Sequence, residues 1–440
     1  MQILPTRPYR LFSANLSMAS QSSDLPDLNV ARDITEISIN RNIMNNGAYF
    51  TVKFVSNSFT FIPPQSILTI IISDYTKGET PVNFGLIGII SGGDGVLPVN
   101  NPGDTAPSES DAIPMEWTFV DIWSVLATTE LIEFSLEDTT MADCLIKIKD
   151  AVAAIPATLS LLAKDTDLDS DMTEPDNSSS YENIFIPGLS YIEALKSLNR
   201  NYGIYNSSMF IYSESIVKEL DKINRTSIIT SINHIVKGQS RNQIYINIGD
   251  PVTDNTTRDA STPSYTIYNN AFKWNVNAVM SLSKPMIMSY QFAGADVFWN
   301  NSFKTAADDG EEFGTELDYF LRVQKVGKEF APERTETSLR SRFDQTIPWI
   351  SITVHPPLWN WSDFRPTTRA IVTYTEKLNK VESEVINGNW CVAQNLVTFS
   401  VEGLNMRVTK NEVNLIKHYT KQSKLKANKI FDSNNNNDIA

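Results

Sequence analysis

The sequence predicts a mainly β protein of the α+β class, in which two β-barrel or sandwich domains are joined by a helical segment. Three observations lead to this prediction. Apolar residues alternate with period two both early and late in the chain, as in half-buried strands. Two stretches with helical spacing lie between these regions. The length of 440 residues favours two or three domains over one.

The first β region is predicted from alternation and from runs of β-branched residues. Phe50, Val52 and Phe54 alternate with Thr51 and Lys53, which places one set on a buried face and the other in water. Further strands are expected at residues 67–72, 84–91 and 117–136, with a Gly- and Pro-rich loop at 92–114.

Two helices are predicted in the middle of the chain, separated by an acidic linker at residues 164–180. The first starts at a cap formed by Thr140. The second starts at the capping-box pair Ser190 and Glu193 and ends at Gly203, which suits a left-handed cap. The apolar stripes are Leu145, Ile148 and Val152 in the first helix, and Ile192, Leu195, Leu198 and Tyr202 in the second.

The second β region follows these helices. One of its clearest strand patterns has Phe272, Trp274 and Val276 alternating with Lys273 and Asn275. An Asn-Gly pair at residues 387–388, followed by Trp390, predicts a tight hairpin. The other expected strands are residues 243–248, the alternating sets Ile350, Ile352, Val354 and Ile371, Thr373, Thr375, and the late set Val397, Phe399, Val401.

The two ends of the chain are polar and poorly patterned. The N-terminal stretch is interpreted as an arm and the C-terminal stretch as a basic helix or tail. The predicted organisation is therefore an N-terminal arm at 1–28, a first β-barrel domain at 29–138, a helical or α+β connecting domain at 139–220, a second β-barrel domain with loop insertions at 221–405, and a basic C-terminal helix or tail at 406–440.

Composition excludes several classes of protein. The net charge of −14 disfavours general nucleic-acid binding, because phosphate is repelled by an acidic surface. Only Cys144 and Cys391 are present, so neither a disulfide scaffold nor a thiolate metal site is expected. No run of about 18 apolar residues occurs, so no membrane-spanning helix is predicted. The stretch from Arg407 to Lys429 contains seven basic residues and a single acid, Glu412. It is interpreted either as a solvated helix and tail or as a docking element for an acidic surface.

No catalytic centre is predicted. His234, His355 and His418 stand in three unrelated contexts, with neither a paired-histidine zinc motif nor a nucleophile elbow. The glycines at 92–95 lie in a Pro-rich loop without a following helix, so they do not form a phosphate loop. We therefore expect a non-enzymatic protein with no catalytic, cofactor-binding or metal-binding residue.

Two motifs have a functional and a structural interpretation. Asp165, Asp167, Asp169 and Asp171 alternate as in a calcium loop, but positions six and twelve hold Ser170 and Asp176 instead of Gly and Glu, which favours an acidic linker. The pair Trp359 and Trp361, followed by Asp363, has the aromatic character of a sugar-stacking site. Such aromatic residues more often anchor a loop to a core or an interface.

Residues 184–212, IFIPGLSYIEALKSLNRNYGIYNSSMFIY, resemble a segment of phage tail baseplate hub proteins of contractile tails. In that family an Ile-Pro step precedes a helix that ends in L-N-x-x-Y-G-I-Y, and a strand follows. Residues 385–410 resemble the hairpin that closes the second tube domain, with Trp390 in the aromatic place and no histidine before the last strand. The residues that match the first motif are Ile186, Pro187, Ala194, Leu195, Leu198, Asn199, Tyr202, Gly203, Ile204 and Tyr205.

The resemblance implies two tube-type β-barrel domains per chain and a homotrimer whose barrels form a pseudo-sixfold ring. Such a ring joins the tail tube to the central spike in the virion baseplate, is assembled in the host cytoplasm, and lets DNA pass without specific binding. Baseplate wedge and tape measure proteins are the further partners it implies. Because phosphate would adhere to a basic channel, an acidic lumen is expected for an acidic chain.

Two alternatives to the hub role remain at this stage. One is another virion component, such as a wedge, fibre or receptor-binding protein with a sugar-binding face. The other is a glycosidase or another hydrolase on a β fold, whose carboxylate pair is defined by spatial rather than sequence spacing.

Overall fold

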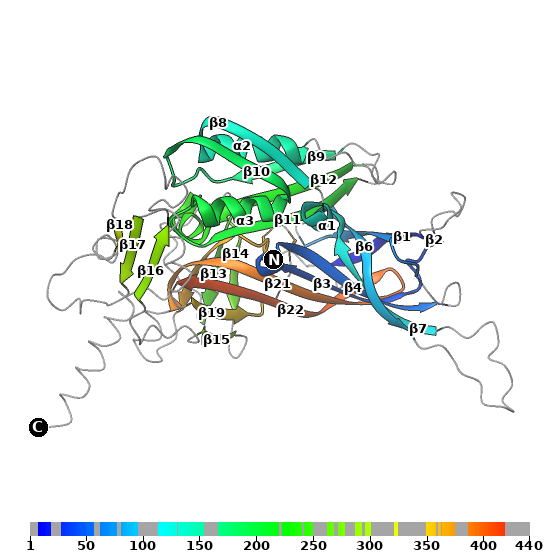
Figure 1. Cartoon of the computed structure of the whole chain (residues 1–440). Coiled ribbons are helices and arrows are strands. Elements are labelled where there is room, and N and C mark those ends of the chain that lie inside the picture. Colours follow the sequence, from blue (N-terminus) through cyan, green and yellow to red (C-terminus); the bar gives the residue numbers. More distant parts are fainter. Residues whose placement is uncertain are drawn as a thin grey trace, which may run out of the picture.

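The mainly β class is confirmed by the computed structural model, whose strands outnumber a few short helices (Figure 1). The structure describes residues 8–18, 28–56, 62–76, 81–95, 113–129, 131–153, 166–219, 222–239, 242–249, 262–267, 272–277, 287–292, 295–300, 321–323, 349–357, 360–361, 363–374 and 386–418.

Eight strands pair in a closed circuit in the order β1–β5–β6–β7–β4–β3–β21–β22, and β22 returns to β1. The seam between β22 and β1 consists of two residue pairs, Tyr9 with Met406 and Arg10 with Asn405. The strands are β1 (Tyr9–Ser17), β3 (Ile34–Asn42), β4 (Gly47–Ser56), β5 (Ile67–Asp74), β6 (Val82–Gly95), β7 (Ile113–Asp121), β21 (Gly388–Glu402) and β22 (Asn405–His418).

The long hairpin of β21 and β22 also belongs to a second set of strands. The first part of β21 pairs with β20, whereas the later part pairs with β3. Likewise, the end of β22 pairs with β19, whereas its start pairs with β1. The second set runs β14–β13–β20–β21–β22–β19–β15 and adds β13 (Gln243–Ile248), β14 (Ser264–Ile267), β15 (Phe272–Asn277), β19 (Trp349–Val354) and β20 (Arg369–Tyr374).

The arrangement as two separate barrels stays a prediction. The second set of strands ends at β14 and β15, and no pairing register joins these two strands within the described residues. The domain boundaries likewise remain a proposal, because β21 and β22 are shared by both sets of strands.

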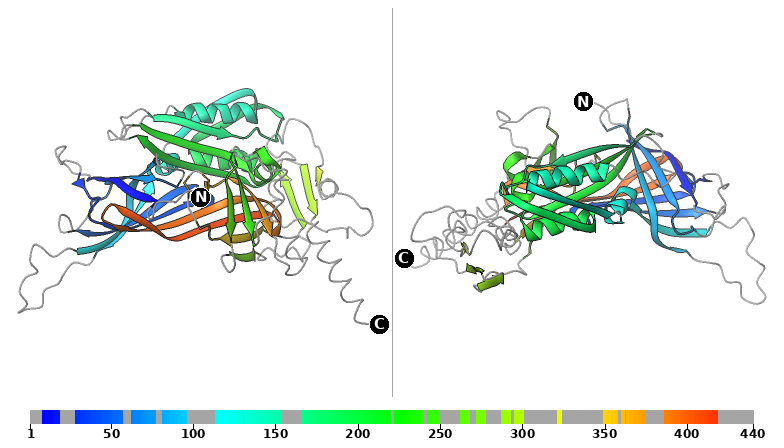
Figure 2. Two further views of the ribbon diagram at one scale, coloured as in Figure 1. Left: turned by 180° about the vertical axis from the view of Figure 1, so that it is seen from behind. Right: turned by 45° about the horizontal axis from the view of Figure 1, so that its top comes forward.

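The connecting segment packs as a separate layer on the strands. Ile67, Ile71 and Ile87 point outwards from β5 and β6 and join a core made by the helices and by β8 and β10. Figures 1 and 2 show this layer on one side of the β1–β7 strands. Its elements are β8 (Leu131–Thr140), β9 (Thr166–Met172), β10 (Ser180–Ser190), β11 (Met209–Glu219), β12 (Lys222–Ser231), α1 (Ile122–Thr129), α2 (Met141–Ala153), α3 (Tyr191–Asn201) and α4 (Ile232–His234).

The remaining elements are short. They are β2 (Leu28–Asn29), which pairs with β1, a 3-10 turn (Ile43–Asn45), a π turn (Ile235–Gln239), and a three-stranded sheet of β16 (Ile287–Phe292), β17 (Ala295–Asn300) and β18 (Leu321–Val323).

Both predicted helices are confirmed as α2 and α3. Ser190 caps α3, because its hydroxyl oxygen accepts the backbone N–H of Glu193 at 3.3 Å. At the other end Gly203 has a φ of 75°, the left-handed conformation that glycine adopts without steric cost.

The cap of α3 gives a modest stability prediction. Ser190→Ala removes the acceptor for the Glu193 N–H and should lower the free energy of unfolding by about 1 kcal/mol. Urea denaturation measures the effect, and Ser190→Asn, which keeps a capping oxygen, should restore most of it. An alanine variant as stable as the parent would show that the cap contributes nothing.

The prediction of an N-terminal arm at residues 1–28 is wrong for β1. This strand pairs along its length with β5 and places Tyr9, Leu11, Ala14 and Leu16 in the main core. A β-bulge between Leu11 and Ser13 shifts the register, which interrupts the period-two pattern by which the strand would be recognised.

The C-terminal prediction is also wrong in part, because residues 405–418 form β22 rather than a helix. Val413 and Leu415 are buried in the core whereas Arg407 and Lys410 are exposed, a strand pattern hidden by the helix-like spacing of the lysines. Residues 419–440 lie outside the described residues.

Three further expectations are corrected. Part of the acidic linker is β9, which pairs in parallel with β12, so tertiary pairing overrides the low strand propensity of aspartate. The expected strand at 117–136 contains α1, because Asp121 caps a helix there. The Asn-Gly pair is not a tight hairpin: Gly388 starts β21 and pairs with Val372 of β20, 16 positions earlier.

Candidate functional site: a buried charged junction and a polar face

A buried cluster of charged side chains joins three parts of the chain. We call it the charged junction and define it as Arg41 from the end of β3, Tyr212 and Glu214 from β11, and Trp361 and Arg365 from the segment before β20. The side chains of Arg41 and Glu214 are 0% and 1% exposed. The junction therefore connects the closed circuit, the connecting segment and the second set of strands.

Hydrogen bonds satisfy the Arg41 guanidinium on three sides. Its Nε donates to Glu214 Oε2 at 3.0 Å and its Nη2 to Oε1 at 2.9 Å, a bidentate pair. Its Nη1 donates to the carbonyl oxygen of Trp361 at 2.7 Å, and the guanidinium lies 3.9 Å from the centre of the indole ring. The cation is thus held by charge, hydrogen bonds and ring stacking together.

Glu214 has two further partners. The hydroxyl of Tyr212 donates to Oε2 at 2.6 Å, and Nε of Arg365 lies 3.0 Å from Oε1, outside good hydrogen-bond geometry. Burial alone would raise the pKa of Glu214, but Arg41 and Arg365 outweigh it and the pKa falls below its usual value. The carboxylate therefore stays ionised and forms a buried ionic interaction with both arginines.

Asp121 is a second buried carboxyl, at the start of α1. Its Oδ1 accepts the backbone N–H of Ser124 at 3.0 Å, and its Oδ2 accepts that of Ser215 on β11 at 2.8 Å. Burial raises the pKa of Asp121 to about 7, and the two backbone hydrogen bonds oppose that rise. Asp121 thus caps the helix and fastens it to β11.

A continuous outer surface, here called the polar face, runs over β7, β4, β3, β21 and β22. One row of cross-strand neighbours carries hydroxyl groups: Thr51 Oγ1 lies 3.0 Å from Thr118 Oγ1, and Ser38 Oγ lies 3.1 Å from Thr398 Oγ1. The polar face consists of Glu116, Thr118 and Val120 on β7, Tyr49, Thr51 and Lys53 on β4, Glu36, Ser38 and Asn40 on β3, Leu396, Thr398 and Ser400 on β21, and Arg407, Lys410 and Glu412 on β22.

Charges on the polar face are balanced and mostly paired. Its acids Glu36, Glu116 and Glu412 match its bases Lys53, Arg407 and Lys410 in number. Lys53 Nζ lies 2.8 Å from Glu36 and 3.9 Å from Glu116, and Lys410 Nζ lies 3.1 Å from Glu412. The face therefore offers hydroxyl groups and mostly neutralised charges, and Arg407 is the base on it that forms no ion pair with a described residue.

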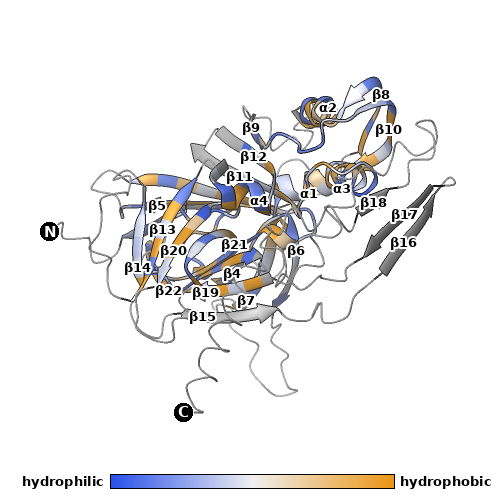
Figure 3. Ribbon diagram, turned by 90° about the vertical axis from the view of Figure 1, so that its left-hand side faces the viewer, coloured by the Kyte–Doolittle hydropathy of each residue, from blue (hydrophilic) through white to orange (hydrophobic). Residues whose placement is uncertain are grey.

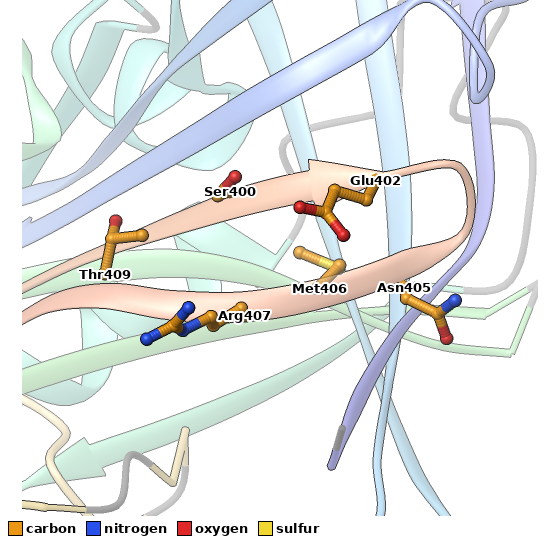
Figure 4. A pocket seen from close by; sticks show the side chains of 6 residues that line it. All are labelled: Ser400, Glu402, Asn405, Met406, Arg407 and Thr409. Atoms are coloured by element: carbon orange, nitrogen blue, oxygen red, sulfur yellow. The ribbon is translucent and has the colours of Figure 1, made fainter. Parts of the chain in front are cut away.

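A hollow of about 130 Å³ lies where β21 and β22 approach their turn (Figure 4). Ligand pockets for small molecules usually measure about 300–1,000 Å³. We therefore assign no ligand to the hollow, which borders the polar face at Ser400 and Arg407. It is lined by Ser400, Glu402, Asn405, Met406, Arg407 and Thr409.

The sequence-predicted candidates do not come together. His234 contacts Asp176 at 3.3 Å and Ser231 at 2.7 Å, whereas Nδ1 of His355 lies 3.2 Å from the carbonyl oxygen of Asn411. His418 ends β22. Among the described residues no three His, Cys, Asp or Glu side chains are placed to hold a metal ion.

The aromatic candidates separate in the same way. The Trp361 ring is stacked between Phe84, at 5.0 Å, and the Arg41 guanidinium, and the residue is 7% exposed. The sugar-stacking interpretation is therefore wrong for Trp361, which anchors its segment to the core. Trp359 lies outside the described residues, as does Asp165, whereas Asp167, Asp169 and Asp171 follow one another along β9.

The residues of the resemblance motif have structural roles in this fold. The Asn199 side-chain oxygen accepts the Ile204 N–H at 3.0 Å, and the Tyr205 hydroxyl donates to the carbonyl oxygen of Thr173 at 2.7 Å. Leu195 and Leu198 are fully buried. The motif therefore specifies how α3 ends and how the chain turns into β11.

No helix among the described residues is long and apolar enough to cross a membrane.

Residues 137–304 match the model of a family described as "Bacteriophage PBS1 gene 109 protein". No curated protein sequence matches the chain. Among solved structures, a tail protein from Neisseria meningitidis MC58 has 11% identity and a TM-score of 0.44, covering 93% of this chain and 96% of that one. A 43 kDa tail protein of prophage MuSo2 from Shewanella oneidensis has 13% identity and a TM-score of 0.44, with 92% and 97% covered. Prophage tail protein gp18 from Listeria monocytogenes EGD-e has 8% identity and a TM-score of 0.39, with 94% and 96% covered.

The matched range of the family model contains the resemblance motif at residues 184–212, whereas residues 385–410 lie outside it. The solved structures to which the chain is similar are described as tail proteins, and residues 137–304 match the phage family named above.

Proposed function

We propose that this chain is the baseplate hub protein of a phage tail, a structural and non-enzymatic component of the virion. In this role three copies form a ring with pseudo-sixfold symmetry that joins the tail tube to the central spike. The observation that carries the proposal is the β21–β22 hairpin, which belongs to both sets of strands. Because the hairpin is shared, the two sets of strands are fixed to one another. Three chains would therefore supply six sets of strands to the ring.

The polar face supports a channel for DNA in such a ring. Proteins that bind DNA do so largely through unpaired Lys and Arg on phosphate. Lys53 and Lys410 on this face already have carboxylate partners at 2.8 Å and 3.1 Å. Its equal numbers of acids and bases favour a neutral lining, so we place the polar face on the channel and propose a lumen that is neutral overall in place of the expected acidic one.

The partners follow from this position. The tail tube and the central spike contact opposite faces of the ring, and wedge and tape measure proteins are further neighbours. A sugar-binding role loses support because Trp361 is buried between Phe84 and Arg41.

The proposal is tested on the purified full chain mixed with candidate spike protein from the same phage. Light scattering coupled to gel filtration should give the mass of three copies, alone or with the spike, and electron cryomicroscopy should show a ring. A chain that stays monomeric and ignores the spike would refute the hub role. A ring with β7, β4 and β3 on its outer rim would refute the channel assignment alone.

A further inference from the structure

The β8–β10 pair forms a two-stranded ribbon whose inner face is covered and whose outer face is not. On the inner face Ile132, Phe134, Ile184 and Ile186 are buried in the core of the connecting segment. Within the described residues β8 and β10 pair only with each other, so the outer edge of each strand has no partner strand. Figure 3 shows the ribbon, together with α2, at the periphery of the molecule.

The outer face of the ribbon combines exposed apolar side chains with acids that form no ion pair with another described residue. Leu131 and Phe185 are 70% and 56% exposed, among the highest values for large apolar residues in the described chain. No Lys or Arg occurs in either strand. The exposed acids are Glu133, Glu137, Asp138 and Glu182.

The chain contains a segment of opposite chemistry beyond β22. Twenty-two residues follow His418, and no acid occurs between Glu412 and Asp432. This basic segment, residues 421–431, also carries apolar side chains. Its lysines are Lys421, Lys424, Lys426 and Lys429, and its large apolar residues are Leu425, Ile430 and Phe431.

We propose that the basic segment docks on the outer face of the β8–β10 ribbon. Its four lysines match four exposed acids, and its apolar residues match Leu131 and Phe185. The polar face is a poorer partner, because its acids already have bases beside them. Docking also neutralises lysines that would otherwise attract DNA phosphate, and it does not depend on ring formation.

Zero-length carbodiimide crosslinking of the full chain tests the contact, because the reagent joins a lysine only to a carboxylate in direct contact. Mass spectrometry should find Lys421–Lys429 coupled mainly to Glu133, Glu137, Asp138 and Glu182. Coupling spread evenly over exposed acids, or none from these lysines, would overturn the proposal.

The rate of trypsin cleavage after the same lysines tests the docking independently of crosslinking, because a docked segment is cleaved more slowly. The variant Glu133→Gln/Glu137→Gln/Glu182→Gln should speed cleavage roughly tenfold, since each exposed pair is weak but three are removed together. Salt at 0.5 M should act likewise on the parent chain. The matched control Glu36→Gln/Glu116→Gln/Glu412→Gln removes the same charge from the polar face and should leave the rate unchanged.

A variant without a charge change separates the apolar contribution. Phe185→Ala should speed cleavage several-fold if the segment covers that ring, while circular dichroism confirms that the ribbon stays folded. Equal cleavage rates in the parent, the acid variant and Phe185→Ala would show that the segment docks elsewhere or not at all.

Discussion

Glu214→Gln is expected to lower the free energy of unfolding by about 3–5 kcal/mol, because it leaves the Arg41 and Arg365 guanidinium groups without their anion. Arg41 is fully buried, so water does not solvate its charge at the surface. Arg41→Met should cost less, since the Arg365 Nε, 3.0 Å from Glu214 Oε1, still compensates the carboxylate. The order of the two losses tests whether Glu214 is the shared centre of the junction. Urea denaturation measures both.

The exposed ion pair of Glu36 and Lys53 provides the control. Its two atoms lie 2.8 Å apart, as close as those of the buried pair, but its side chains are 34% and 45% exposed. Glu36→Gln should therefore cost no more than about 1 kcal/mol. A Glu214→Gln variant as stable as Glu36→Gln would show that the buried charges contribute no more than surface ones.

The sequence predicts the parts of the fold that depend on local pattern. Both α2 and α3 follow from caps and apolar stripes within a dozen residues, and β4 and β5 from uninterrupted runs. β1 is missed because one bulged residue, Phe12, breaks its alternation. β9 is missed because its pairing with β12, and not its own composition, makes it a strand.

The charged junction had no signal in the sequence. Arg41 and Glu214 are 173 positions apart, and each stands among polar neighbours that look solvent-exposed. Asp121 did have a local signal in the sequence. Aspartate is a typical N-cap residue, because its side-chain oxygen accepts the backbone N–H of the third residue after it, here Ser124. That signal was outweighed by the β-favouring Ile, Trp, Val and Thr residues of α1.

Asp121 is expected to make stability fall as pH rises from about 4 to about 7. Its ordinary pKa of 3.8 applies to the unfolded chain, whereas burial raises the pKa in the folded chain to about 7. Between these values the folded chain holds a proton that the unfolded chain has released, so stability decreases with pH. Three pKa units correspond to a loss of roughly 4 kcal/mol.

Comparison with Asp121→Asn isolates this titration. Asparagine does not ionise. Its amide NH2 group, however, would face the backbone N–H of either Ser124 or Ser215, and the lost hydrogen bond should lower the free energy of unfolding by about 1–3 kcal/mol. The variant should therefore be clearly less stable than the parent at pH 4, and the difference should shrink by pH 8.

Asp143 provides a control of opposite sign, because hydrogen bonds from Thr140 lower its pKa and its contribution to stability is lost on acidification. Asp143→Asn should therefore differ most from the parent at neutral pH and least in acid. If the stability curves of the parent and Asp121→Asn run parallel from pH 4 to pH 8, Asp121 does not titrate in that range. The backbone hydrogen bonds from Ser124 and Ser215 would then outweigh its burial.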